Sequence, residues 1–291
     1  MPLKLKPIVK WAGGKRQLLP DIRRRLPQIN WNEAAYYEPF VGGAALLFHI
    51  QPARAIINDV NPELINLYQM IKQHPEELIE RLRAHRNEEL YYYDIRQQDR
   101  DHERYSRMSA VERAARLIYL NRTCFNGLYR VNKRGQFNVP FGKNKRPDFV
   151  QEKKIRNMSR YFNDADITIT AGDFAASVEH AKCGDFIYFD PPYDALTKTA
   201  AFTSYTNAGF NRHEQSRLAD LFQNLHERGV YLMLSNHATD FIRELYEKFY
   251  IHEVQARRLI NSKGTARGKI NEVLVLNYTA AHESDNSLML C

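Results

Sequence analysis

The residues Asp190-Pro191-Pro192-Tyr193 bring a carboxylate, backbone carbonyls and an aromatic face together in one short stretch. They follow the apolar run 186–189, whose aromatic and β-branched residues predict a buried strand. The strand must end at Asp190, because proline lacks an N–H and restricts the residue before it. Ligands of open α/β sheets bind at the carboxyl ends of strands, and both proline carbonyls are expected to be free to accept hydrogen bonds. The stretch therefore suits a planar group with an exocyclic amine, although a plain strand-ending turn with a capping aspartate is the alternative.

A Gly-rich turn and an acid follow two earlier predicted strands. Residues 36–48 predict a strand, a turn around Gly42 and an apolar helix. This order resembles the first βα turn of a nucleotide-binding sheet, but G-x-G-x-x-G is absent, so no pyrophosphate site is inferred. Residues 53–59 predict a second strand ending in Asp59, where a carboxylate is placed to accept hydrogen bonds from ribose hydroxyls. Asp59 could also cap the helix predicted to start at residue 62, and both roles can hold at once.

Two further stretches offer ring faces beside charges. Trp11 and Lys15 flank a Gly pair that permits close approach of a ligand, so they offer a stacking face and a cation for a carboxylate. A plain turn with a packed tryptophan explains the same residues. The strand-like alternation over 167–174 ends in Asp173 and Phe174, which suit an adenine if the carboxylate meets its amino group and the ring its face.

Positive charge is concentrated in one part of the chain. The net charge is +8, yet residues 116–160 hold twelve Lys or Arg against only Asp148 and Glu152, a net charge of +10. The remainder of the chain is therefore slightly acidic. A basic region this concentrated is typical of a protein that binds a polyanion, whereas a merely solvated basic face is usually interleaved with acids.

Within that basic region, residues 121–149 alternate basic, amide and aromatic side chains. Val131 and Phe137 bracket a hairpin-like loop with Gly135 at its turn. This mixture serves phosphate contacts, base edges and stacking, so we expect a protruding recognition hairpin. An ordinary basic loop is the alternative.

The remaining periodicity predicts the elements around these sites. Largely helical structure is expected over 63–120, helices over 213–227 and 240–249, strands over 230–236 and 272–278, and exposed loops over 203–210 and 261–269.

Length and composition limit the class of protein. The chain has 291 residues, 44% hydrophobic and 26% charged, and its apolar runs are far shorter than the roughly 20 residues that span a bilayer. The amino terminus lacks the apolar region of a signal peptide. Three widely spaced cysteines indicate neither a disulfide framework nor a zinc site. We expect a cytoplasmic protein that does not contact membranes.

Taken together, these motifs closely resemble the DNA adenine-N6 methyltransferases of the Dam type, including the DpnII-type modification enzymes. The matching stretches, in the family's order, are K-W-A-G-G-K-R at 10–16, Y-x-E-P-F-V-G-G at 36–43, N-D-x-N at 58–61, F-N-G-L-Y-R-V-N at 125–132, F-N-V-P-F-G at 137–142, G-D-F at 172–174 and D-P-P-Y at 190–193. One departure is Ala44, where the family commonly has a third glycine, a change expected to tighten the turn without closing it.

The resemblance implies an α/β fold, a Rossmann-like sheet that binds S-adenosylmethionine, with an inserted, mostly helical DNA-recognition domain that carries a β-hairpin. We expect a discontinuous catalytic domain over 1–62 and 165–280, the recognition domain over 63–164, and a disordered tail over 281–291.

The resemblance also assigns residues. Cofactor contacts fall on Trp11, Lys15, Asp59, Asp173 with Phe174, and the turn around Gly42, and Asp190 also lies near the cofactor. Asp190, Pro191 and Tyr193 form the target-adenine pocket. Base-reading residues for the palindrome GATC include Leu128, Arg130 and Pro140, and the other expected DNA contacts are Arg122, Phe125, Asn126 and Asn132. Arginine pairs bidentately with guanine O6 and N7, so Arg130 has the chemistry this requires.

The expected reaction is direct transfer of a methyl group to a flipped adenine in double-stranded DNA, without a metal. Asp190 and the Pro191 carbonyl would accept the amino hydrogens, and Tyr193 would stack on the ring. An N4-cytosine enzyme more often begins this motif with serine, and a glutamine-N5 protein methyltransferase usually begins it with asparagine. A DNA-binding protein that has lost its activity is a further alternative, and the presence of Asp190, Tyr193 and Trp11 together argues against it. The sequence leaves open whether the enzyme works beside a cognate restriction endonuclease or alone in housekeeping; a monomer is expected to suffice.

Overall fold

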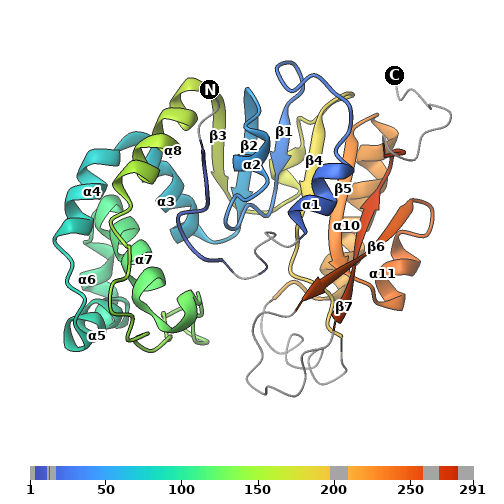
Figure 1. Cartoon of the computed structure of the whole chain (residues 1–291). Coiled ribbons are helices and arrows are strands. Elements are labelled where there is room, and N and C mark those ends of the chain that lie inside the picture. Colours follow the sequence, from blue (N-terminus) through green and yellow to red (C-terminus); the bar gives the residue numbers. More distant parts are fainter. Residues whose placement is uncertain (1–3, 12, 14–17, 197–208, 258–268, 281–291) are drawn as a thin grey trace. The chain divides into compact units, whose positions relative to one another are not determined.

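The computed structural model describes residues 4–11, 13, 18–196, 209–257 and 269–280 (Figure 1). Within these residues the seven strands form one sheet in the order β3-β2-β1-β4-β5-β7-β6. The strands are β1 (Tyr36–Glu38), β2 (Arg54–Asp59), β3 (Asp166–Ala171), β4 (Phe186–Phe189), β5 (Tyr231–His237), β6 (Tyr250–Arg257) and β7 (Lys269–Leu276). The fold is therefore α/β, as predicted. No helix in the described ranges is long and apolar enough to cross a membrane.

The direction of the strands sets where polar residues gather. Strand β1 pairs in parallel with β2 and β4, and β4 pairs in parallel with β5. Strand β7 runs antiparallel to β5 and β6. The carboxyl ends of β1, β4 and β5 consequently lie along one edge of the sheet, which is where Asp190 follows β4.

The chain divides into two compact units. The first comprises residues 1–14, 42–51 and 59–172, and the second comprises 15–41, 52–58 and 173–291. We describe each unit by itself.

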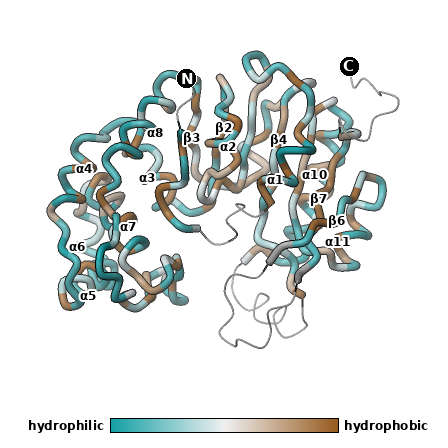
Figure 2. Tube along the Cα trace, in the orientation of Figure 1, coloured by the Kyte–Doolittle hydropathy of each residue, from teal (hydrophilic) through white to brown (hydrophobic). Residues whose placement is uncertain are grey.

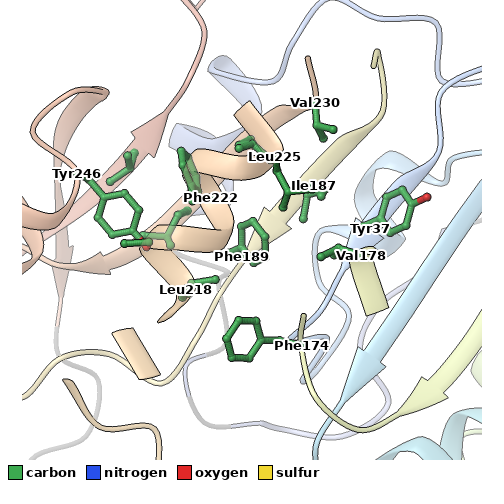
Figure 3. Packing of buried hydrophobic residues seen from close by; sticks show 14 of the residues in the cluster. Tyr37, Phe174, Val178, Ile187, Phe189, Leu218, Phe222, Leu225, Val230 and Tyr246 are labelled. Atoms are coloured by element: carbon green, nitrogen blue, oxygen red, sulfur yellow. The ribbon is translucent and has the colours of Figure 1, made fainter. Parts of the chain in front are cut away.

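The second unit is organised around the buried strand β4, all four residues of which are inaccessible to solvent. Helix α10 (Arg212–Glu227) covers it with Leu218, Phe222 and Leu225, which point toward Ile187 and Phe189 in Figure 3. Such interdigitated apolar side chains leave little room for the strand to shift. Within its described residues, this unit also has helix α1 (Leu19–Arg24), the 3₁₀ turn η3 (Ala176–Val178) and helix α11 (Asp240–Leu245).

The first unit is mostly helical. Its helices are α2 (Leu47–Ile50), α3 (Pro62–Gln73), α4 (Pro75–Arg83), α5 (Glu89–Gln97), α6 (His102–Ser106), α7 (Ala110–Thr123) and α8 (Glu152–Asp164), with 3₁₀ turns η1 (Gln98–Arg100) and η2 (Phe125–Gly127). Helices α3, α4, α7 and α8 pack on one another (Figure 1) and carry both hydrophobic and hydrophilic residues (Figure 2), as amphipathic helices do. A capping box formed by Ser109 and Glu112 starts α7, whose last three residues begin the basic stretch 121–149, called the recognition stretch below.

Most predicted elements are confirmed within the described residues, and the differences lie mainly at the ends of strands and helices. Strand β1 stops at Glu38 because Pro39 cannot donate to the ladder. Helix α11 ends at Leu245, four residues before the predicted end. Strand β6 was not predicted, and it forms the edge of the sheet beside β7. The predicted loops at 203–210 and 261–269 lie mainly outside the described residues, and so does the predicted tail.

Candidate active site and nucleic-acid interface

A chain of hydrogen bonds begins at Tyr188 on β4 and ends at the Asp190 carboxylate. Ser235 on β5 donates from Oγ to Asp190 Oδ1 over 2.9 Å. The Tyr188 hydroxyl lies 3.0 Å from Ser235 Oγ, and since the serine proton is already donated, the tyrosine must be the donor there. Tyr188 and Ser235 are buried, whereas Asp190 is half-buried. The carboxylate therefore has a fixed orientation while remaining accessible from one side.

The second proline carbonyl is not free, contrary to the expectation from sequence. Gln215 on α10 donates from Nε2 to the Pro192 carbonyl oxygen over 2.8 Å. Asn236 donates in turn to Gln215 Oε1 over 3.1 Å, and its own Oδ1 accepts from the backbone N–H of Asp194 over 2.9 Å. Both amides are buried, so this relay fixes the backbone on either side of Tyr193.

Asp194 anchors the far end of the same loop. Its carboxylate accepts hydrogen bonds from Arg212, with both distances at 3.2 Å, and from the Thr239 hydroxyl at 2.8 Å. His237 Nδ1 lies 2.6 Å from the Asp194 carbonyl oxygen, and because a carbonyl only accepts, Nδ1 carries the proton. The 190–194 loop is thus fixed at both ends, by the buried Ser235 at Asp190 and by the half-buried Thr239 and the exposed Arg212 at Asp194.

Tyr193 is oriented by two contacts. Its hydroxyl donates to Glu272 Oε2 on β7 over 3.1 Å. Its ring meets the ring of His237 edge to face, with centroids 4.9 Å apart. Burial and then the neighbouring Asp190 charge raise the pKa of the Tyr193 phenol well above its usual range, so the hydroxyl stays protonated and donates.

Sequence reasoning missed the partners that hold this loop. Three consecutive residues at the end of β5, Ser235, Asn236 and His237, each contact the 190–194 loop or the residue supporting it. The available signal was a polar Ser-Asn-His run directly after the apolar run 230–234, at a strand end parallel to β4.

In the first unit, the Gly42 turn and Asp59 are joined by a hydrogen bond. The backbone N–H of Gly42 donates to Asp59 Oδ2 over 3.1 Å, and that of Asn61 donates to Asp59 Oδ1 over 2.9 Å. Burial raises the pKa of the Asp59 carboxyl against these two hydrogen bonds, which favour the charged form. The cap of α3 is Asn61, whose side chain accepts from the N–H groups of Glu63 and Leu64, so Asp59 is not the helix cap.

The turn itself requires unusual backbone. Gly42 has φ 45°, and a Cβ there would lie 3.0 Å from the Trp11 side chain. Ala44 is also left-handed, with φ 55°, although it bears a methyl group that is fully buried. The alanine therefore accepts a conformation that favours glycine, and the expected tightening of the turn stays a prediction.

Trp11 presents its ring within the same unit. It stacks on Tyr129 with centroids 4.5 Å apart and planes 23° apart. Tyr129 lies in the recognition stretch, so a predicted cofactor residue and the predicted DNA-reading segment touch directly. Lys15 lies outside the described residues.

Asp173 and Phe174, in the second unit, have partners of their own. Arg217 on α10 holds the Asp173 carboxylate with two hydrogen bonds of 3.0 and 2.6 Å, which lowers the pKa of that carboxyl. The Arg217 guanidinium lies 4.1 Å from the Phe174 ring centroid, and Phe40 stacks on that ring at 5.3 Å. Phe174 is 4% exposed and serves the core; its predicted contact with an adenine stays a prediction.

The recognition stretch forms the predicted hairpin. Val131 and Phe137 form an antiparallel bridge, and Gly135 at the turn has φ 74°. Phe125 is 51% exposed despite its size, and Asn126 is exposed with a left-handed φ of 56°.

Three more predicted DNA contacts lie in this stretch. Pro140 is exposed, and its carbonyl accepts from the Phe125 N–H over 2.9 Å. Leu128 is half-buried against the helical core of the unit. Arg122 donates from Nε to the Asp148 carbonyl over 3.0 Å.

Arg130 and Asn132 differ in what their side chains do. Arg130 is exposed and donates from Nε to Asn138 Oδ1 over 2.7 Å, so the opposite strand of the hairpin orients its guanidinium. Asn132 is committed to the turn: its Oδ1 accepts from the N–H groups of Arg134 and Gln136. The Asn132 side chain therefore has a structural role in the turn, and base reading by Arg130 stays a prediction.

The hairpin is pinned to the helices by charge. Asp99 Oδ2 accepts from the Phe137 N–H over 2.8 Å and lies 2.9 Å from Arg116 Nη2. Arg116 is buried and also donates to the Ile95 and Arg96 carbonyls. Arg100 donates to the Phe137 carbonyl over 2.6 Å. This group of three charged residues, Asp99, Arg100 and Arg116, is called the hairpin anchor below.

Comparison with known proteins agrees with the motifs. The family model for D12 class N6 adenine-specific DNA methyltransferase matches residues 11–260. The chain is 49% identical over 278 residues to the type II methyltransferase M1.LlaDCHI of Lactococcus lactis subsp. cremoris, covering 95% of this chain and 96% of that protein. It is 42% identical over 293 residues to the type II methyltransferase M.MjaIII of Methanocaldococcus jannaschii, covering 95% and 100%. It is 36% identical over 277 residues to the DNA adenine methylase of Escherichia coli strain K12, covering 94% and 95%.

Motifs, fold and relatives thus lead to one family. The resemblance drawn from the D-P-P-Y, E-P-F-V-G-G and N-G-L-Y-R stretches is confirmed, and so is the expected kind of enzyme. The chain belongs to the D12 class N6 adenine-specific DNA methyltransferases and is a DNA adenine methyltransferase.

Proposed function

We propose that this enzyme transfers a methyl group from S-adenosylmethionine to the N6 amino group of adenine within GATC in double-stranded DNA. The observation that carries the proposal is the half-buried Asp190 carboxylate, oriented by Ser235 and followed at once by Pro191 and Tyr193. A carboxylate and a carbonyl side by side suit the two hydrogens of an exocyclic amine.

The residues of each unit suit the parts of S-adenosylmethionine. In the first unit, the left-handed Gly42 has no room for a side chain beside Trp11, and the Asp59 carboxylate suits ribose hydroxyls. In the second unit we assign Asp173, Phe174 and Asp190 to the cofactor, and Lys15 completes the set. When bound, the cofactor supplies an electrophilic methyl group on a positively charged sulfur.

The residues of the chain would then position the acceptor. An adenine inside a duplex cannot reach a carboxylate at the edge of a sheet, so the base must leave the stack. Tyr193 would stack on the base, whose amino hydrogens would meet the Asp190 carboxylate and the Pro191 carbonyl. These hydrogen bonds draw the nitrogen lone pair out of conjugation with the ring and direct it outward. The Asp190 carboxylate also stabilises the positive charge that develops on the nitrogen.

Recognition of GATC is assigned to the hairpin. Arg130 has the donor geometry to meet guanine O6 and N7, and Asn138 holds it in place. Leu128 and Pro140 supply apolar contacts, and Phe125 and Asn126 add an exposed ring and amide. The +10 charge of residues 116–160 would meet the phosphates, so binding should weaken steeply with salt.

The predicted domain boundaries give these roles to the catalytic segments 1–62 and 165–280 and to the inserted segment 63–164. We propose that one copy of the chain methylates each strand of the palindrome in turn. The relatives include proteins named type II methyltransferases and others named DNA adenine methylases.

The test is transfer of labelled methyl from S-adenosylmethionine to two unmethylated duplexes that differ only in GATC or GTAC. We expect label on GATC alone, recovered as N6-methyladenine. Equal label on both duplexes would contradict the assignment of GATC. Binding without label on either would contradict the proposed reaction.

A further inference from the structure

A carboxylate on a neighbouring strand stands against Tyr193. In the antiparallel pairing of β5 with β7, Glu272 lies directly opposite His237. Directly opposed residues of an antiparallel pair project to the same face of a sheet. Tyr193 contacts both of them, its hydroxyl with Glu272 at 3.1 Å and its ring with His237 at 4.9 Å between centroids.

These two contacts together define the plane of the Tyr193 ring. An edge-to-face contact alone allows a phenyl ring to rotate about its long axis and to tilt, whereas a hydroxyl held at a fixed acceptor removes the tilt. The hydroxyl oxygen lies on the axis of the terminal torsion, so its hydrogen bond fixes the direction of the ring's long axis, while the contact with His237 limits rotation about that axis.

We propose that Glu272 is a positioning residue for methyl transfer, which fixes the Tyr193 ring in the plane on which the target adenine stacks. This inference rests on the proposed function, because it assumes that the base stacks on Tyr193. Glu272 acts through the phenol hydroxyl and does not itself meet the substrate.

The role requires a hydrogen-bond acceptor at residue 272 and does not require its negative charge. Because the Tyr193 phenol remains protonated, a neutral amide oxygen accepts its hydrogen as well as a carboxylate does. An electrostatic role, in which Glu272 stabilises positive charge on the methylated nitrogen, would instead depend on the charge. Glutamine in place of Glu272 distinguishes the two.

The experiment compares Glu272→Leu, Glu272→Gln, Tyr193→Phe and the double variant Glu272→Leu with Tyr193→Phe. Single-turnover methyl transfer to a GATC duplex gives the rate, and 2-aminopurine at the target position reports stacking of the displaced base. We expect Glu272→Leu and Tyr193→Phe each to slow transfer by about ten-fold, because the ring loses its restraint. The double variant should be no slower than either single one, and Glu272→Gln should lie within about three-fold of the wild type.

The matched control is Glu253→Leu, which removes an exposed carboxylate from β6 opposite Val273. It should leave the rate and the fluorescence unchanged, and DNA affinity should be unchanged in every variant.

A wild-type rate for Glu272→Leu, an equal loss in Glu272→Gln, or multiplied effects in the double variant would each overturn the inference. If Glu272→Leu fails to fold, the other two single variants still test the inference. Tyr193→Phe must slow transfer, and Glu272→Gln must keep it close to the wild-type rate. Absence of transfer by the wild type would instead overturn the proposed function.

Discussion

The D-P-P-Y loop and the hairpin at 131–137 are both held in place by side chains, but the groups on their backbone differ. In the second unit, Ser235 donates to Asp190, Tyr188 bonds to Ser235, and the neutral Gln215 and Asn236 amides hold the flanking backbone, while carboxylates lie at Tyr193 and at the far end of the loop. In the first unit, the hairpin anchor holds the backbone of Phe137 through a buried ion pair.

The contrast follows from what each loop has to present. Under the proposed reaction, the neutral Ser235 hydroxyl orients the Asp190 carboxylate toward the target amine without adding a charge of its own. Under the proposed function the hairpin would present cations to DNA phosphates, and the buried ion pair would keep its backbone in place against their pull. We therefore expect loss of the hairpin's supports to lower stability, and loss of the D-P-P-Y loop's supports to lower the rate of methyl transfer.

The largest expected effect comes from breaking the hairpin anchor. Asp99→Ala leaves the buried Arg116 guanidinium without its carboxylate and the Phe137 N–H without its acceptor. We expect a loss of about 3–5 kcal/mol in the free energy of unfolding, measured by urea titration. Asp99→Asn is the matched control, since it keeps an acceptor for Phe137 and should lose less. A wild-type midpoint for Asp99→Ala would show that the anchor is not structural.

Acid should destabilise the first unit at a higher pH than the second. The His85 ring stacks on the Tyr119 ring, and burial lowers the pKa of this histidine to about 4. Its folded pKa lies below the unfolded value of about 6.5, so stability is complete above pH 6.5 and falls as pH drops from there to 4. The difference amounts to about 3 kcal/mol, and His85→Phe should remove it.

The two tryptophans allow this prediction to be read in each unit. Trp11 lies in the first unit and Trp31 in the second, so variants that retain one or the other report urea unfolding separately. We expect the acid-dependent loss in the Trp11 signal. Asp173 in the second unit has a lowered pKa beside Arg217, so its contribution is lost only below the usual range of a carboxyl. An acid loss that persists in His85→Phe would mean that another group is responsible.

A smaller effect is expected from the amide relay beside Tyr193. Asn236→Leu leaves the Asp194 N–H without its acceptor and Gln215 Oε1 without its donor. We predict a decrease of about 10- to 100-fold in the rate of transfer, because the loop moves relative to the substrate. Affinity for GATC should not change, since the recognition residues belong to the first unit. If Asn236→Leu lost affinity for GATC and kept its rate, the D-P-P-Y loop would serve DNA recognition and not methyl transfer.

The smallest expected effect concerns the contact between predicted cofactor and recognition residues. Tyr129→Leu removes the ring that stacks on Trp11 at 4.5 Å. Aromatic pairs of this kind contribute about 1 kcal/mol, so affinity for S-adenosylmethionine should fall about five-fold in calorimetric titration. Tyr129→Phe keeps the stack and serves as the control. Equal affinities in the two variants would mean that Tyr129 does not support Trp11.

The sequence predicted well those features that depend on neighbouring residues. The strand before Asp190, the turn at Gly42, the hairpin between Val131 and Phe137 and the helices of the first unit follow from local propensity and periodicity.

The supports were not predictable in the same way. The contact of Tyr193 with Glu272 depends on which strands are neighbours and in which register, and these residues are far apart in the sequence. The Pro192 carbonyl looked free because Gln215 comes from a helix that begins some twenty residues later. Asn132 and Arg130 look alike as DNA contacts in sequence, and only the closed turn shows that the asparagine amide is engaged.

The division of labour between the two loops is tested most directly by one paired measurement. Asp190→Ala and Arg130→Ala are each assayed for methyl transfer rate and for the ratio of affinities for GATC and GTAC duplexes. The account predicts that Asp190→Ala loses transfer by about a thousand-fold or more while its affinity ratio stays that of the wild type. Arg130→Ala should lose the affinity ratio while still transferring methyl to bound adenine. Near-normal transfer by Asp190→Ala, or full discrimination by Arg130→Ala, would contradict it.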